Sequence, residues 1–232
     1  MRIWHERRRA VLLAAIATVV GGLVAGVTTD GAHAGDGPYP DGIVVVGDSI
    51  TARYSDDEGA ADQGWWSFVG RHFDADVRTF AQSGSGYQRQ GNRCTGDVFA
   101  DRIEAFEDPP SVFIVEGGRN DWSTCRDGRR VRATDAAVQD AVVSYLRLAR
   151  QQLPESTRIV VLGPPWGELH PWEMRRITSI IRTAAGREGL EYVSTTGTLD
   201  QHGRTDDGVH PTRAGSKALG DVVVAALSQP AP

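Results

Sequence analysis

Short apolar runs of β-branched residues constrain the fold of this sequence most strongly. The first run, at residues 43–46, reads Ile-Val-Val-Val with no polar alternation, which is typical of a strand buried on both faces of a parallel sheet. Comparable runs lie at 76–80, 111–116, 158–162 and 190–193. We therefore expect five parallel strands, separated from one another by segments that can form crossover helices.

The segments between and after these runs predict the helices. The clearest is 134–153, where Thr134 can cap the start, apolar residues recur at helical spacing, and Pro154 ends the helix. Further helices are expected at 66–72, 96–106, 171–187 and 212–227. Because crossovers between parallel strands are right-handed, this alternation predicts a three-layer α/β/α sandwich with its ligand site beyond the carboxyl ends of the strands.

The N-terminal segment differs from the rest of the chain. The basic stretch MRIWHERRR precedes an apolar run at 11–27, and Ala32-His33-Ala34 has the small-x-small pattern of a cleavage site. We predict an export signal at 1–34, cleaved after Ala34, and therefore a secreted or extracytoplasmic protein. The alternative is a membrane anchor formed by 11–27, and the adjacent arginines leave general and twin-arginine export open.

The remainder of the chain is expected to form one domain. Residues 35–42 are mostly Gly, Pro and Asp and predict a short tether, whereas 43–232 is long enough for a single α/β core. Beyond residue 34 the chain retains 21 basic and 28 acidic residues, with Lys217 as its only lysine. This acidic balance does not favour a nucleic-acid partner.

The two cysteines, Cys94 and Cys125, bear on the redox compartment. In an exported protein thiols pair, so a Cys94–Cys125 disulfide is expected, the alternative being two thiols too far apart to bond. Neither cysteine belongs to a C-x-x-C pair or has metal-ligand spacing to histidine. No metal site and no cofactor are therefore predicted.

Four polar blocks follow predicted strands or precede the last helix. GDSIT (47–51), QSGSGY (82–87) and GGRND (117–121) come directly after the first three strands, and DGVHP (207–211) precedes the final helix. Because the carboxyl ends of parallel strands meet at one sheet edge, we expect these blocks to converge. They would then bring together a hydroxyl, flexible glycine backbone, a neutral amide donor, and an imidazole with a carboxylate three residues before it.

These blocks, in this order, resemble the GDSL/SGNH hydrolase family, and the resemblance extends from residue 43 to the C-terminus. It implies a flavodoxin-like sheet of order 2-1-3-4-5 and a serine esterase in which Ser49 is the nucleophile, His210 its base and Asp207 the carboxylate that orients the base. The implied oxyanion hole consists of Ser49, Gly84 and Asn120, with Gly86 as the alternative glycine. No G-x-S-x-G elbow of the α/β-hydrolase type is present.

The substrate is less constrained by the sequence. Asp48, Arg119, Trp122 and Trp166 are expected to line the site, where aromatic faces could stack on sugar rings or acyl chains, although a structural role for Asp48 is equally compatible with the pattern. The predicted partner is a small-molecule, lipid or carbohydrate ester, with small acyl groups favoured because no long apolar lid segment is evident. The alternatives are an acyltransferase acting on cell-envelope or extracellular polysaccharide and a non-catalytic carbohydrate-binding envelope protein.

Overall fold

The computed structural model describes residues 42–55, 60–165 and 172–231. The predicted export signal, and the predicted tether except for Gly42, lie outside the described residues. Among the helices that are described, none has the length and apolar character needed to cross a membrane.

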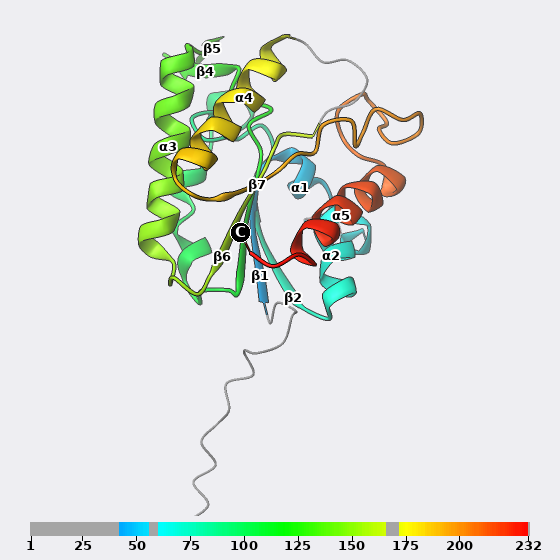
Figure 1. Ribbon diagram of the computed structural model, residues 1–232. Helices are drawn as coiled ribbons and strands as arrows, with labels where there is room; N and C mark the ends of the chain where they lie inside the picture. The colour runs from blue at the N-terminus through cyan, green and yellow to red at the C-terminus, as the bar shows by residue number, and fades with distance from the viewer. Residues whose placement is uncertain (1–41, 56–59, 166–171, 232) are drawn as a thin grey trace, which may run out of the picture. The chain divides into compact units, whose positions relative to one another are not determined.

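Five parallel strands form the central sheet, as the alternation of runs and helices predicts (Figure 1). They are β1 (Gly42–Gly47), β2 (Asp76–Ala81), β3 (Val112–Glu116), β6 (Arg158–Leu162) and β7 (Glu191–Val193). Their order is β2-β1-β3-β6-β7, which is the flavodoxin-like order 2-1-3-4-5 and confirms the expected fold class.

Helices cover both faces of this sheet. They are α1 (Ser49–Ser55), α2 (Trp65–Phe73), α3 (Asp135–Gln152), α4 (Trp172–Arg187) and α5 (Arg213–Leu227). Helices α3 and α4 pack on one face, and α1, α2 and α5 lie on the other (Figure 1). The three-layer arrangement confirms the sandwich predicted from the sequence.

The central strand β1 explains why its run shows no polar alternation. Val44 and Val46 belong to the hydrophobic core that includes the buried faces of α3 and α4. Ile43 and Val45 belong to the opposite core, which includes α2 and α5. All four side chains are at most 1% exposed, so every position of the strand is selected for burial.

Threonine side chains define where two of the predicted helices begin. Thr134 accepts a hydrogen bond from the backbone N–H of Ala137 at 3.2 Å, and Thr212 accepts one from Gly215 at 3.2 Å. Each hydroxyl satisfies a backbone donor that the first helical turn leaves unpaired, which contributes about 1 kcal/mol to helix stability.

The helix expected at 96–106 is not formed. Two short 3-10 helices occur instead, η3 (Phe99–Asp101) and η4 (Ile103–Phe106), separated at Arg102. The Arg102 guanidinium donates to the carbonyl oxygens of Gly47 at 2.7 Å and Phe80 at 3.0 Å. These tertiary bonds hold the backbone at Arg102 outside helical geometry and override the local helical pattern.

Several short elements were not predicted. A two-stranded antiparallel hairpin follows the GGRND block, with strands β4 (Ser123–Arg126) and β5 (Arg129–Arg132). Two further 3-10 turns are η1 (Ala61–Gln63) and η2 (Asn92–Cys94). Helix α1, which begins at Ser49, also lacked a periodic signal because it has only seven residues.

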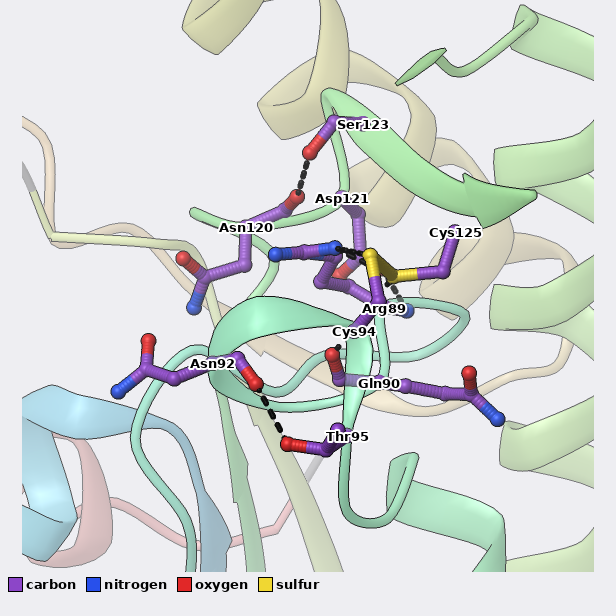
Figure 2. Close-up of a disulfide and its surroundings, with 9 residues drawn as sticks. All are labelled: Arg89, Gln90, Asn92, Cys94, Thr95, Asn120, Asp121, Ser123 and Cys125. Atoms are coloured by element: carbon purple, nitrogen blue, oxygen red, sulfur yellow. Dashed lines mark hydrogen bonds between the residues drawn. A yellow bond between two sulfur atoms is a disulfide. The ribbon is translucent and has the colours of Figure 1, made fainter. Parts of the chain in front are cut away.

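The expected disulfide is present and joins η2 to the β4–β5 hairpin (Figure 2). Cys94 and Cys125 have Cα atoms 5.5 Å apart, within the range that a disulfide spans. The guanidinium of Arg89, which is only 2% exposed, lies 3.1 Å from the Cys94 Sγ and 2.5 Å from the Cys125 Sγ. The disulfide therefore connects the loop after β2 to the loop after β3.

Removing this disulfide should destabilise the protein without changing its fold. Because the bond closes a loop of 31 residues, we expect the Cys94→Ser/Cys125→Ser variant to lose about 3–4 kcal/mol of unfolding free energy, mainly through the greater entropy of its unfolded chain. Urea denaturation of the variant and the oxidised wild type measures the difference. Equal midpoints and slopes for the two proteins would contradict the expectation.

Candidate active site

The Ser49 hydroxyl lies at the carboxyl end of the central strand, at the start of α1. The sharp exit from β1 requires Gly47, because a Cβ there would come within 2.5 Å of the Thr51 Oγ1. The Asp48 carboxylate accepts a hydrogen bond from the N–H of Ile50 at 2.9 Å and so supports the first turn of α1. Ser49 itself is partly exposed, which leaves its hydroxyl accessible.

Ser49, His210 and Asp207 form one continuous hydrogen-bonded array. The His210 Nε2 lies 2.9 Å from the Ser49 Oγ, and the His210 Nδ1 lies 2.7 Å from the Asp207 Oδ2. Ser49 and His210 are 161 residues apart in the sequence, so the array depends on the fold and not on local geometry. A hydroxyl, an imidazole and a carboxylate in this order can activate a nucleophile.

Asp207 is organised as an anion. It accepts hydrogen bonds from the His210 ring and from the backbone N–H groups of Val209 at 2.9 Å and His210 at 2.7 Å. Partial burial acts to raise the pKa of Asp207, but these hydrogen bonds outweigh it and hold the pKa well below its usual range. The carboxylate is therefore charged at neutral pH and fixes the orientation of the imidazole.

The Asn120 side chain lies against the glycine-rich block. Its Nδ2 donates to the Ser85 carbonyl at 2.9 Å and lies 3.4 Å from the Asp48 Oδ2. Gly84 has a φ of +77°, and a Cβ there would come within 2.4 Å of the Asn92 Oδ1. The Gly86 N–H donates to the Arg89 carbonyl at 2.9 Å. Asn120 thus reaches the peptide between the two candidate glycines.

Asp121 fixes the backbone of the glycine-rich block through hydrogen bonds. Its carboxylate accepts the backbone N–H groups of Tyr87 at 3.0 Å, Gln88 at 2.9 Å and Arg89 at 3.2 Å. This arrangement requires glycine at 86, because a Cβ there would lie 2.3 Å from the Asp121 Oδ2. The block after β2 is therefore held in place by the residue that follows Asn120.

Asp48 is buried away from the substrate surface, which agrees with the structural role and not with the substrate-lining role among the two that were expected. It is 0% exposed, as is Glu116 at the end of β3. The Glu116 Oε2 accepts a hydrogen bond from the Thr51 Oγ1 at 2.8 Å, and Thr51 in turn accepts one from the Trp65 Nε1 at 3.1 Å. These buried groups stabilise the turn that carries Ser49. Asp48 contributes to it through its hydrogen bond to the Ile50 N–H, which is a structural role.

Sequence reasoning did not identify the buried polar groups Glu116 and Arg102 as parts of this region. Glu116 is the last residue of an otherwise apolar strand. A charged residue at the end of such a strand was the sequence feature that could have indicated a buried polar group here. Arg102 had no such signal, since its partners are the backbone of β1 and β2 and the hydroxyl of Ser85. Burial and the charge of Asp48 raise the pKa of Glu116 well above its usual range.

The remaining substrate-lining candidates are placed differently from one another. Arg119 donates to the Pro165 carbonyl at 3.4 Å, and its charge lowers the pKa of Asp48 and Glu116 in opposition to their burial. The Trp122 indole packs against the core on the α3–α4 side, whereas Trp166 lies outside the described residues. Among the side chains that the structure describes, no group of three His, Cys, Asp or Glu could hold a metal ion.

The buried carboxyl groups predict an unusual pH dependence of stability. Burial raises the pKa of Asp121 to about 6, whereas an unfolded aspartate titrates near pH 4. Between these values the folded state binds more protons than the unfolded state, so the unfolding free energy falls as pH rises, by up to about 3 kcal/mol for this group. Burial also raises the pKa of Asp48 to about 6, which adds in the same direction.

Urea denaturation at several pH values between 4.5 and 6.5 measures this dependence. We expect the unfolding free energy to decrease across that window, and to decrease less steeply in the Asp121→Asn variant. An unfolding free energy that stays constant or increases over the same window would contradict the assignment of raised pKa values.

Comparison with known proteins supports the interpretation of this site. A family model described as the GDSL-like lipase/acylhydrolase family matches residues 45–218, which include all three members of the hydrogen-bonded array. No curated protein sequence matches the chain.

Solved structures with the same fold include several esterases. A family two carbohydrate esterase from Clostridium thermocellum, in complex with cellohexaose, has a TM-score of 0.64 and 20% identity over 82% of this chain, which spans 64% of that protein. The acetyl xylan esterase AlAXEase has a TM-score of 0.62 and 15% identity, covering 80% of this chain and 98% of its own. A putative GDSL-like lipase from Bacteroides ovatus has a TM-score of 0.57 and 15% identity, with coverages of 79% and 95%.

The family match covers the strands, the nucleophile block and the asparagine block, and extends through the aspartate and histidine block into α5. The parallel sheet of order 2-1-3-4-5 agrees with the fold of the esterases that the chain resembles. This chain therefore belongs to the GDSL-like lipase/acylhydrolase family and is a carboxylic ester hydrolase.

Proposed function

We propose that the protein is an exported serine esterase that forms an acyl intermediate on Ser49 and removes small acyl groups, such as acetyl, from a polysaccharide. The observation that carries this proposal is the hydrogen-bonded array, in which the Ser49 Oγ lies 2.9 Å from the His210 Nε2 and the His210 Nδ1 lies 2.7 Å from the Asp207 Oδ2. This geometry meets the requirement that nucleophile and base lie within hydrogen-bond reach.

The proposed reaction has two symmetrical halves. The His210 Nε2 removes the proton from the Ser49 Oγ, which attacks the ester carbonyl carbon and forms a tetrahedral oxyanion. The carbon–oxygen bond to the alcohol then breaks, and the leaving oxygen takes the proton from His210. In the second half water gives a proton to His210 and attacks the acyl carbon, after which the Ser49 Oγ leaves and recovers the proton.

Three donors are proposed for the oxyanion. Ser49 contributes its backbone N–H and Asn120 its Nδ2, which now bonds the Ser85 carbonyl. The third donor is the backbone N–H of Gly84, with that of Gly86 as the alternative. An incoming oxyanion would replace the Ser85 carbonyl as the acceptor for the Asn120 Nδ2. Neutral amide donors suit this task because they stabilise the negative charge without protonating it, and each typically accounts for about 3–4 kcal/mol of the barrier.

The substrate and compartment rest on further observations. The Clostridium thermocellum carbohydrate esterase, in complex with cellohexaose, and the acetyl xylan esterase share this fold, which supports an acylated carbohydrate as the substrate. The disulfide between Cys94 and Cys125 is compatible with an oxidising compartment, and the Ala32-His33-Ala34 pattern supports cleavage of a signal.

A trapping experiment tests the intermediate. An alkyl p-nitrophenyl phosphonate should phosphonylate Ser49 and release p-nitrophenol, and peptide mass mapping should place the adduct within α1. Hydrolysis of p-nitrophenyl acetate should be lost in proportion to labelling. An active protein that carries no adduct, or an adduct on another serine, would refute the assignment of the nucleophile.

Product analysis separates hydrolysis from acyl transfer. With p-nitrophenyl acetate and a large excess of xylo-oligosaccharide, we expect free acetate as the product with and without the sugar. Accumulation of a new sugar ester at the expense of acetate would instead identify the protein as an acyltransferase, since the same acyl-serine would then be intercepted by a sugar hydroxyl.

A further inference from the structure

The disulfide joins two segments that are unusually rich in arginine. Segments 88–95 and 122–132 contain six arginines and a single acidic residue, Asp127, in a chain whose acidic residues outnumber its basic ones by 30 to 25. The bond between Cys94 and Cys125 brings these segments together (Figure 2), and η2 packs beside β5. Positive charge that is spread along the sequence is therefore gathered at one place.

Four of these arginines are exposed, and we call them together the hairpin arginine surface: Arg93, Arg126, Arg129 and Arg130. Within the described part of the chain, none of the four makes an ion pair, whereas seven other arginines pair with carboxylates there. Their guanidinium groups thus keep the capacity to bind an anion from outside the chain.

The arrangement concentrates like charges instead of dispersing them. Arg126 and Arg129 are directly opposite each other in the antiparallel register, next to the turn, and like charges in that position destabilise a hairpin. Arg130 lies opposite Cys125 and its guanidinium lies over the Trp122 ring. Burial and the charge of Arg130 lower the pKa of the neighbouring Arg89, which reflects the repulsion within this region. An anionic ligand would relieve that repulsion.

The hairpin arginine surface is also close to the proposed site along the chain and in the structure. Strand β4 begins three residues after Asn120, and Ser123 donates to the Asn120 carbonyl through its N–H at 3.3 Å and its Oγ at 3.4 Å. Figure 2 shows the disulfide beside Asn120 and Asp121. A polymer held on the hairpin could therefore extend to Ser49, whereas a small ester would not contact both places.

We infer that the hairpin arginine surface binds the carboxylate groups of a uronate-containing polysaccharide whose acyl groups are removed at Ser49. This inference rests on the proposed function and names its substrate class. Guanidinium groups match carboxylates through paired N–H donors, and several such contacts along one polymer add, although each exposed contact is weak.

The test compares a double variant with a charge-matched control. Arg126→Gln/Arg129→Gln removes two charges from the hairpin arginine surface, and Arg175→Gln/Arg187→Gln removes two exposed charges from α4. Acetate release is measured from acetylated polygalacturonate, from acetylated neutral xylan and from p-nitrophenyl acetate. Thermal unfolding of both variants establishes that each is folded.

We expect the hairpin variant to raise the KM for acetylated polygalacturonate about five- to tenfold, with no change for p-nitrophenyl acetate or xylan and no change in the control variant. Sodium chloride at 0.5 M should remove most of the difference, because the contacts are exposed and screened. An equal KM in both variants, or an equal loss on all three substrates, would overturn the inference.

Binding measured without turnover separates this inference from the proposed function. Calorimetry of the Ser49→Ala protein with unacetylated polygalacturonate should show binding that the additional hairpin substitutions weaken by the same factor. If the protein hydrolyses no ester but binds polygalacturonate through the hairpin, the proposed function is wrong, whereas the assignment of the hairpin arginine surface as a carboxylate-binding site is confirmed. If inorganic polyphosphate or single-stranded DNA binds more tightly than polygalacturonate at equal ionic strength, the carboxylate assignment is wrong.

Discussion

Ser49→Ala should lower kcat for p-nitrophenyl acetate by roughly 10⁴-fold or more, because it removes the only atom that can carry the acyl group in the proposed mechanism. The Ser49 Oγ is the group that the His210 Nε2 contacts at 2.9 Å. The residual rate should come from the oxyanion donors and substrate binding alone. Steady-state kinetics with a short-chain p-nitrophenyl ester measures the loss.

A matched serine substitution controls for general effects on the protein. Ser179 lies on the exposed face of α4, and Ser179→Ala should retain wild-type kcat and KM. The thermal midpoints of both variants should stay near that of the wild type, since Ser49 is partly exposed. A Ser49→Ala protein with the wild-type rate would show that the reaction uses a different nucleophile.

Asp207→Asn should lower kcat by roughly 10²- to 10⁴-fold while changing KM little. Asparagine can still accept hydrogen bonds from the backbone of Val209 and His210, which preserves the turn. Its side-chain NH₂ is a donor, however, and would favour the imidazole tautomer whose Nε2 carries a proton and cannot accept the one on Ser49. The loss of the charge also removes the stabilisation of the imidazolium.

The neighbouring Asp206 supplies the control for this prediction. Its carboxylate pairs with Arg53 at 2.7 Å, and within the described residues the hydrogen bonds of the His210 ring go to Ser49 and Asp207. Asp206→Asn should therefore leave kcat nearly unchanged, although it removes the same charge one residue away. Equal losses in the two variants would show that the negative potential of the loop, and not the orientation of the imidazole, supports the reaction.

The sheet could be predicted from the sequence because its strands are buried on both faces. A run such as Ile43–Val46 contributes side chains to both cores, so its apolar character is continuous and easily recognised. The predicted helices that formed were those with a full apolar face and a cap, such as the one that Thr134 begins. For each strand and helix, the apolar pattern in the sequence is clearer when the element buries more apolar surface.

The elements that were missed are stabilised by contacts that have no periodic pattern. The β4–β5 hairpin buries little and depends on the disulfide and on its attachment to Asn120, so its arginine-rich strands do not alternate like a buried strand. At 96–106 the tertiary hydrogen bonds of Arg102 decide the backbone. Long-range polar contacts of this kind are not encoded in local spacing.

The active-site residues were accessible to sequence reasoning to different degrees. Ser49 and His210 belong to motifs that lie next to a predicted strand or helix. The structure places the His210 Nε2 2.9 Å from the Ser49 Oγ. The buried groups that support them were harder to recognise, because Glu116 was marked only by its charge at the end of an apolar strand and Arg102 had no local signal. Two roles were expected for Asp48, one lining the site and one structural, and its complete burial and its hydrogen bond to Ile50 agree with the structural role.

The separation of the nucleophile from its base has a consequence for when the protein becomes active. Ser49 is available early in synthesis, but His210 follows it by 161 residues and lies just before α5, which packs on one face of the sheet. An unfinished or unfolded chain therefore contains a serine that has no partner to deprotonate it. On this architecture, ester cleavage cannot begin until the segment that carries His210 has folded against the carboxyl end of β1. A cell that makes this protein is therefore shielded from deacylation by partly folded chains.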